Sequence, residues 1–393
     1  MIINNGQEAI GVYIGDTPIA EIYQGENLVW SATIREFNNK MIAYKTVDNE
    51  PSDFNFNLGN NPSNPIRSNK YYEDLDACVM VFKNAVTEIP RGSISAIPGI
   101  TKIIHLPSTT EKIGDYFMYW GTDLTSIDLS GLSNVTSIGS NFLRNCPITS
   151  IDLSALTKVT SIGDYFLSSC TGLKSIDLSG LSNVTSIDKE FLNSCSGLTS
   201  IDLSPLSKVT SISNFFLEYC TGLTSIDLSG LSNVTSIGGW FLNGCSGLTS
   251  IDLSPLSKVT SISNEFLAGC RGITSLDFNG LSNVTSIGND FLYTCYNLKS
   301  IDFNGLSNVT SVGTYFLERC DKLETITGTI RGINGPVALS TLANLTADSA
   351  MVIINGLSEE TTNKTMQLHS NTYNSLTEEQ IAVATAKGWS VVG

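Results

Sequence analysis

Apolar residues recur through the middle of the chain with a nearly constant period of 25 residues. The repeating unit reads Leu-Thr-Ser-Ile-Asp-Leu-Ser-x-Leu-Ser-x-Val-Thr-Ser-Ile-x-x-x-Phe-Leu-x-x-Cys-x-x. Its Asp recurs at Asp128, Asp152, Asp177, Asp202, Asp227, Asp252, Asp277 and Asp302. Its Cys keeps step at Cys146, Cys170, Cys195, Cys220, Cys245, Cys270, Cys295 and Cys320. A fixed period of this length predicts a solenoid in which each repeat forms one coil.

The order of apolar and polar residues within a unit predicts the path of one coil. Asp128 stands between two apolar residues in a segment of period two, so it points outward while its neighbours point inward. A second extended piece follows at 135–138, and Phe142, Leu143 and Cys146 fit one face of a single helical turn. Stacked neighbours complete the core that one unit cannot close. The expected fold is an α/β solenoid, a leucine-rich-repeat array of short parallel strands.

The residues before the repeats predict two further regions. Residues 1–33 contain two echoes of a strand–turn–strand pattern, at 12–19 and 22–29, and predict a small N-terminal β-hairpin docking module. Such a small unit is marginally stable alone and is expected to need a partner surface. Residues 34–103 predict a linker, an N-terminal cap and a first degenerate coil, with a loop at 47–70 that is rich in Asn, Pro and Ser.

The solenoid is expected over 104–326 and a C-terminal cap over 327–393. The period stops after residue 326, as it should where a polar cap covers the core. Thr346 is expected to cap one helix, and the capping box at 377–380 is expected to open another. A strand follows at 389–392, so the cap is expected to be of mixed α/β type.

Charge narrows the classes of partner. The chain has 22 basic and 37 acidic residues and a net charge of −15, which disfavours nucleic acid and anionic membrane surfaces. No run of apolar residues has the length of a membrane-spanning helix, so no membrane insertion is expected. The first 30 residues lack the cationic start and long apolar stretch of a secretory signal.

The aspartate column suggests cation binding but has a simpler interpretation. Eight carboxylates ~4.8 Å apart would repel by about 0.9 kcal/mol per neighbouring pair even in water. A calcium strip is one reading. The favoured reading is that hydroxyl groups, water and a modest rise in pKa relieve the repulsion, since calcium sites gather oxygens from several directions. No metal and no cofactor is therefore expected.

The cysteines lack the paired short spacings of a zinc site. Each fills the same slot of its coil, so it is expected to act as a small buried hydrophobe. Free thiols also agree with folding in a reducing cytoplasm.

Catalytic chemistry finds no support in the sequence. The two histidines, His105 and His369, lie far apart, and no phosphate loop, nucleophile elbow or paired acid arrangement is present. A repeat array also places like residues at equal spacing, whereas an active site needs unlike groups that converge. The chain is expected to be non-enzymatic.

Residues that vary between coils indicate a binding surface. The core positions are constant, whereas the position before Phe and a pair before Cys change from coil to coil. Aromatic residues at these positions are the candidate partner contacts, and they are Tyr165, Phe215, Trp240, Tyr315, Tyr219 and Tyr293. The expected partner is a protein or a glycan. Neutral drift at solvent-facing positions is the alternative explanation, and homo-oligomer formation also stays open.

The repeats resemble the BspA-like leucine-rich repeats. The likeness rests on Ile-x-Leu-Pro at 104–107, on Ile-Gly-Asp-Tyr-Phe at 113–117 and on the units that follow, and it covers residues 79–326. The family unit is nearer 23 residues, so the Gly-Leu-Ser-Asn or Pro-Leu-Ser-Lys insert of these repeats lengthens one turn of the coil. The family occurs in surface proteins of gut and oral anaerobic bacteria and their phages, which implies an adhesin or binding protein. Residues 376–389 resemble the C-terminal cap of such proteins, and residues 21–30 are similar to short N-terminal modules of phage tail and virion proteins.

Three functions are compatible with this resemblance. The favoured one is a phage virion-associated or host-attachment protein, located on the particle, whose residues 1–33 bind other virion proteins. This preference rests on the lack of a signal peptide, because a phage protein is released by lysis. The alternatives are a bacterial cell-surface adhesin and an intracellular scaffold that binds a basic partner through its acidic strip.

Overall fold

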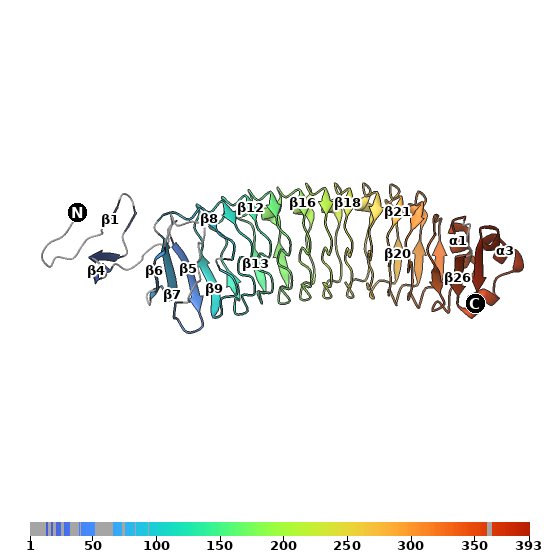
Figure 1. Cartoon of the computed structure of the whole chain (residues 1–393), viewed down its shortest axis with the longest axis horizontal. Coiled ribbons are helices and arrows are strands. Elements are labelled where there is room, and N and C mark those ends of the chain that lie inside the picture. The colour runs from blue at the N-terminus through green and yellow to red at the C-terminus, as the bar shows by residue number, and fades with distance from the viewer. Residues whose placement is uncertain are drawn as a thin grey trace.

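The computed structural model describes residues 13–14, 17–18, 21–24, 27–31, 39, 41–51, 66–72, 75–82, 84–92, 94–359 and 364–393. These residues form a rod of stacked coils (Figure 1). Strands β5 to β9 lie near one end, and α1, β26 and α3 lie at the other.

Two columns of short parallel strands run along the rod and form what we call its strand sides. On the first strand side, β9 (Ile100–His105) pairs with β11 (Ser126–Ile127), β13 (Ser150–Asp152) with β15 (Ser175–Asp177), and β20 (Ser275–Asp277) with β22 (Ser300–Asp302) and then β24 (Thr325–Thr327). On the second strand side lie β8 (Glu88–Ile89), β10 (Lys112–Ile113), β12 (Ser137–Ile138), β14 (Ser161–Ile162), β16 (Ser186–Ile187), β17 (Ser211–Ile212), β18 (Ser236–Ile237), β19 (Ser261–Ile262), β21 (Ser286–Ile287) and β23 (Ser311–Val312). Equivalent residues pair, as Ser150 does with Ser175, so the predicted parallel stacking is confirmed.

A short 3₁₀ helix turns the chain between the two strand sides in five coils. These helices are η1 (Ser179–Leu181), η2 (Ser204–Leu206), η3 (Ser229–Leu231), η4 (Ser254–Leu256) and η5 (Asn304–Leu306). The leucine at the end of each one is buried.

One apolar core runs the length of the rod. A single cluster of buried residues extends from Ile42 in β5 to Val391 in β27. Along its axis the rings of successive repeat phenylalanines, from Phe117 to Phe316, stack with centroids 5.3 to 6.2 Å apart. The predicted shared interior is therefore confirmed.

The third side of each coil differs from the prediction. Phe142, Leu143 and Cys146 do not lie on a helical turn, and no α-helix occurs between residues 104 and 326, all of which the structure describes. Instead every second residue has a positive φ, for example 64° at Tyr165 and 53° at Leu167. This backbone directs N–H groups toward neighbouring coils, where they find carbonyl partners that a helix would have supplied internally.

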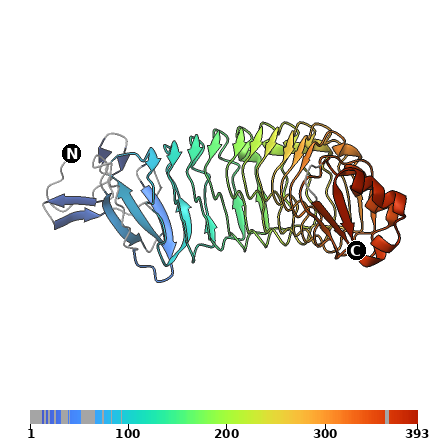
Figure 2. The same ribbon diagram turned by 45° about the vertical axis from the view of Figure 1, so that its right-hand side comes forward.

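A mixed sheet, antiparallel except where β9 meets β11, caps the first coils (Figure 2). Its strand order is β11-β9-β5-β7-β6, and β5 (Met41–Thr46) is antiparallel to both β7 (Ala77–Phe82) and β9. Strand β6 (Ile66–Tyr72) pairs antiparallel with β7 at the edge. The predicted loop at 47–70 is thus wrong over its last five residues, because pairing with a distant strand fixed a segment that lacks a local strand signal.

Two antiparallel pairs occur within residues 1–33. Strand β1 (Tyr13–Ile14) pairs with β2 (Thr17–Pro18), and β3 (Glu21–Gln24) pairs with β4 (Asn27–Ser31). They match the two expected strand–turn–strand segments, and their docking role stays a prediction.

The other end carries a small cap with a parallel sheet. Strands β25 (Val337–Leu339), β26 (Lys364–Leu368) and β27 (Trp389–Val392) pair in that order, with helices α1 (Ala347–Gly356), α2 (Ser370–Asn374) and α3 (Glu378–Ala386). Thr346 caps α1, and Thr377 with Gln380 forms the expected capping box of α3. Helix α2 is additional. None of the described helices has the length and apolar character that crossing a membrane requires.

Candidate functional site

The third side of the rod is built from nine-residue turn segments, and we call it the turn face. Each segment runs from the residue after the second strand to the residue after Cys, as in 188–196, 213–221, 238–246 and 263–271. Its Phe, the following Leu and its Cys are buried, whereas the first three, the sixth, the seventh and the ninth positions carry residues that vary. The backbone therefore fixes where variable side chains stand.

Lateral hydrogen bonds hold the turn segments in their strained conformation. The N–H of Tyr165 donates to the carbonyl of Lys189 in the next coil at 2.7 Å, and that of Leu167 donates to Phe142 in the preceding coil at 2.9 Å. A non-glycine residue at positive φ costs on the order of 1 kcal/mol. These bonds to both neighbours offset that cost, so even bulky residues occupy the positions.

All six predicted aromatic contacts lie in turn segments, and they are Tyr165, Phe215, Trp240, Tyr315, Tyr219 and Tyr293. The rings of Phe215 and Trp240 stack with centroids 4.6 Å apart. The ring of Tyr165 packs against the Arg144 guanidinium at 4.0 Å. Tyr315 is 54% exposed, without a ring partner among the described aromatics. The structure thus places the six on one face and joins two of them directly.

Tyr219 and Tyr293 line a hollow of about 350 Å³ in the turn face. Its floor is formed by Gly244 and Gly269, which occupy the position just before Cys. The other coils carry side chains at that position, namely Trp120, Asn145, Ser169, Ser194, Tyr219, Thr294 and Arg319. The Tyr219 ring lies over Gly244, where a Cβ atom would come within 2.3 Å of its Cδ1. The Tyr219 ring therefore takes the space that Gly244 leaves, and the hollow lies beside it at Gly269.

Polar groups rim this hollow. On one side Asn243 Nδ2 donates to Glu265 Oε2 at 2.9 Å. Arg271 and the hydroxyl residues Thr221 and Ser246 also line it. The site thus offers hydrogen-bond donors and acceptors beside aromatic surface.

A buried carboxyl group adjoins the hollow. Glu218 is only 7% exposed and accepts a hydrogen bond from Asn193 Nδ2 at 2.7 Å. Burial raises the pKa of Glu218 to about 7, the charges of Glu190 and Glu265 add to the rise, and the bond from Asn193 opposes it. Sequence reasoning missed this residue. The sequence does mark it, because Glu218 places a carboxyl group at a position where the two adjacent coils carry amides, Asn193 and Asn243.

Two successive blocks of the chain, 176–225 and 226–275, allow the turn face to be compared with the rest of the coil. The blocks differ at nine positions, which are Asp188/Gly238, Lys189/Gly239, Glu190/Trp240, Ser194/Gly244, Phe215/Glu265, Glu218/Ala268, Tyr219/Gly269, Thr221/Arg271 and Leu223/Ile273. The first eight pairs lie in turn segments, and the last exchanges one buried aliphatic residue for another. Nearly all change between the blocks is thus confined to one face.

The aspartate column has a structural role. Each aspartate accepts a hydrogen bond from the backbone N–H two residues later, as Asp152 does from Ser154 at 2.8 Å. Hydrogen bonds from Ser154 hold the pKa of Asp152 below its usual value, and bonds from Ser229 lower that of Asp227. The expected rise in pKa is therefore wrong for these two carboxyls. Within the described residues, no group of three or more His, Cys, Asp or Glu side chains is placed to hold a metal ion.

The eight repeat cysteines are buried free thiols, as is Cys78. Each repeat thiol donates to a backbone carbonyl of the preceding coil, as Cys220 does to Leu192 at 3.2 Å. Burial raises the pKa of four of them to about 12, namely Cys146, Cys195, Cys245 and Cys295. The slot therefore selects a small apolar residue that can also donate.

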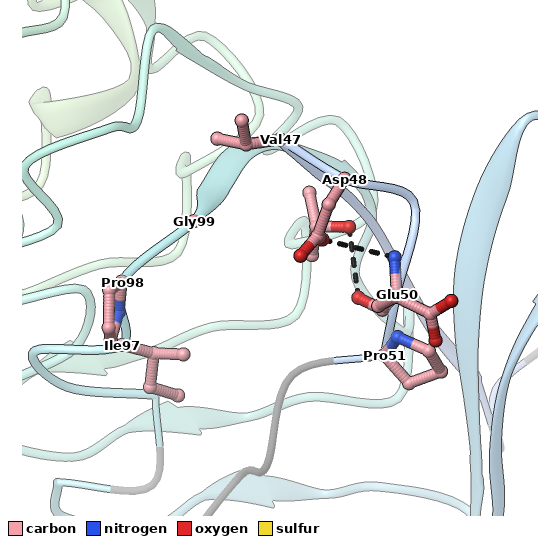
Figure 3. Close-up of a pocket in the computed structure, with 8 residues that line it drawn as sticks. Val47, Asp48, Glu50, Pro51, Ile97, Pro98 and Gly99 are labelled. Atoms are coloured by element: carbon pink, nitrogen blue, oxygen red, sulfur yellow. Dashed lines mark hydrogen bonds between the residues drawn. The ribbon is translucent and has the colours of Figure 1, made fainter.

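A second hollow, of about 300 Å³, lies at the N-terminal cap (Figure 3). Asp48 and Glu50 lie on one side of it, opposite Ile97 and Pro98. Asp48 Oδ1 accepts from the Glu50 N–H at 3.1 Å, and Thr46 Oγ1 donates to the Glu50 carbonyl at 2.9 Å. These two hydrogen bonds hold the turn that follows β5, and this turn forms one side of the hollow. The acidic residues there are thus explained by the structure of the turn.

Comparison with known proteins identifies the family. A model of the BspA-type leucine-rich-repeat region, in six copies, matches residues 87–224 and 210–334, which is more than half of the chain. No functionally curated protein matches the sequence.

Solved structures similar to this chain include three bacterial proteins, two of them described as leucine-rich. A cell-surface protein of Faecalibacterium prausnitzii is 20% identical over 58% of this chain and 60% of its own, with a TM-score of 0.38. A protein of Bacteroides ovatus is 16% identical over 84% of this chain and 91% of its own, with a TM-score of 0.40. The functional domain of InlJ from Listeria monocytogenes is 16% identical over 74% and 76%, with a TM-score of 0.28. This chain spans 60% of the length of the Faecalibacterium protein. From the matched residues 87–334, the chain belongs to the BspA-type leucine-rich-repeat family.

Proposed function

We propose that the chain is a non-enzymatic binding protein that recognises a protein or glycan on a host surface through its turn face. The observation that carries this proposal is the confinement of change between the two 50-residue blocks. Neutral drift acts on exposed positions of every side. Exposed residues outside the turn face are nevertheless identical between the blocks, as at Ser200/Ser250 and Lys208/Lys258. Because the sequence differences between the blocks are nearly confined to the turn face, they support selection on the shape and chemistry of that face.

A variant with Phe215, Trp240 and Tyr315 changed to Ser tests the proposal. Binding of labelled protein to a panel of whole gut and oral anaerobic bacteria would be measured by flow cytometry. Loss of these aromatic anchors, of which Tyr315 is exposed and Phe215 and Trp240 are half-buried, is expected to weaken binding to any positive strain by about tenfold or more.

The matched control changes Ser200, Ser225 and Ser250 to Gln on the strand sides, where their exposed side chains make no contact needed for the core. It should bind as the parent does. Equal binding by the aromatic variant, or loss in the control alone, would refute recognition through the turn face.

We also propose that the protein is part of a phage particle, with residues 1–33 attached to other virion proteins and the rod exposed. The similarity of residues 21–30 to N-terminal modules of virion proteins supports this location. The alternative is a bacterial cell-surface adhesin, which the family resemblance supports equally. An intracellular scaffold for a basic partner agrees only with the net charge of −15.

Mass spectrometry distinguishes these locations. Peptides of this chain are expected in gradient-purified phage particles, at a constant ratio to the structural proteins. Their recovery by protease treatment of intact, uninfected cells would instead establish the adhesin.

A further inference from the structure

The hollow between Tyr219 and Tyr293 interrupts an otherwise filled row of side chains. In two successive coils the position before Cys is a glycine, Gly244 in the first and Gly269 in the second. A Cβ atom on Gly269 would approach no atom closer than 3.4 Å, which is ordinary van der Waals contact, so a side chain fits there. A ligand entering here would lie beside the Tyr219 ring, which covers Gly244.

The wall of the hollow provides an aromatic platform. The ring of Tyr219 is half exposed and is supported from below by Gly244. The C–H groups on one face of a sugar ring form an apolar surface that packs well on such a ring. This arrangement suits a flat, rigid ligand with one apolar face.

The rim supplies the complementary polar groups. Asn243 and Arg271 can donate hydrogen bonds, Glu265 can accept them, and the hydroxyl of Thr221 can do both. Sugar hydroxyls need donors and acceptors together, whereas a purely apolar ligand would leave these groups unpaired. The hollow, of about 350 Å³, lies near the lower end of the 300–1,000 Å³ usual for small ligands.

The charge of the surroundings selects among sugars. Glu190, Glu218 and Glu265 lie close enough together for their charges to raise the pKa of Glu218. The net charge of −15 on the whole chain repels anionic ligands, whereas the hollow itself is lined by one carboxylate, Glu265, and one guanidinium, Arg271. Neutral sugars avoid that repulsion.

We propose that this hollow is a carbohydrate subsite that takes one or two neutral sugar rings of an oligosaccharide, stacked on Tyr219. The inference rests on the proposed function and narrows its partner class to a neutral glycan.

Gly269→Tyr is the most direct variant, because it fills the hollow with the residue that the coil two places earlier carries at this position. Tyr219 occupies the same position with φ 55°, against 70° at Gly269, so the backbone accepts a tyrosine there. Gly269→Ser is the matched control, since Ser194 shows that serine also fits this position. Tyr219→Ala removes the platform, and Tyr219→Phe keeps it.

The probe is an immobilised panel of neutral oligosaccharides of glucose, galactose, mannose and N-acetylglucosamine, with sialylated counterparts. Binding of the full chain would be followed by calorimetry on the best panel member, with melting temperatures to verify folding. The parent protein should bind at least one neutral member. Gly269→Tyr and Tyr219→Ala should each weaken that binding by about tenfold or more, whereas Gly269→Ser and Tyr219→Phe should stay within about threefold.

Three results would overturn the subsite: no neutral member binds, Gly269→Tyr binds as the parent does, or sialylated members bind better. Recognition of a surface protein elsewhere on the turn face has a separate signature. In that case the Phe215, Trp240 and Tyr315 variant loses cell binding while Gly269→Tyr retains it, so the proposed function stands and only the sugar subsite fails.

Discussion

Individual residues of the turn segments make hydrogen bonds that connect one coil to the next. Cys220 fits a small buried slot, and its thiol also donates to the carbonyl of Leu192, a residue held at a φ of 53°. The apolar nature of this slot could be predicted from the repeat pattern. The donor role could not, because the acceptor lies 28 residues earlier and is reached only when the coils stack.

Glu218 makes the stability of the solenoid depend on pH. Its pKa is raised to about 7 in the folded protein, mainly by burial, from an ordinary value of 4.5. The folded state therefore binds the proton more tightly than the unfolded state does. The destabilising effect is absent below pH 4.5, grows as pH rises, and is complete above pH 7.

Glu218→Gln should relieve this effect while keeping an acceptor for Asn193. We expect the variant to be more stable than the parent at pH 8, by on the order of 2 kcal/mol once screening of the Glu190 and Glu265 charges is allowed for. At pH 4 the two proteins should unfold alike. Urea unfolding at both values measures the difference, and an equal gain at both would show that ionisation of Glu218 is not its source.

At the scale of elements, local signals were sufficient where hydrogen bonds are local. The capping box at Thr377 and Gln380 and the cap at Thr346 stand where the sequence predicted them. The turn segments were predicted as helical turns, because Phe142 and Cys146 have helical spacing. Lateral bonds to the two neighbouring coils override that spacing, and strand β6 was likewise determined by its partner β7.

The 50-residue repetition also has an explanation at this scale. Gly230 and Pro205 occupy the same slot of successive coils, at η3 and η2. A Cβ atom on Gly230 would lie 2.0 Å from the carbonyl oxygen of Leu203 in the preceding coil. Glycine is required in this coil, whereas proline fits the first turn of the 3₁₀ helix in the preceding one, so the two residues alternate in this slot over 176–275.

For the whole molecule, the sequence predicted one continuous core with caps at both ends. It also placed six aromatic residues on a common face. It did not reveal the hollow, because the lining residues come from four successive coils and include two glycines, Gly244 and Gly269. Which gaps align across coils becomes visible only once the register is known.

Recognition through the turn face is the central claim, and the two blocks provide its most direct test. Five residues of the second block are changed to those of the first, as Trp240→Glu, Glu265→Phe, Ala268→Glu, Gly269→Tyr and Arg271→Thr. Four of the changes leave the buried core as it is, whereas Ala268→Glu places a carboxyl group in the buried slot that Glu218 fills in the first block. Melting temperatures verify that the variant folds.

Binding of the five-residue variant is measured on a strain or an oligosaccharide that the parent protein binds. The strand-side variant, with glutamine at positions 200, 225 and 250, is measured in the same way. A turn face that recognises the partner predicts a loss of about tenfold or more for the five-residue variant and none for the strand-side variant. Undiminished binding by the five-residue variant would contradict the claim.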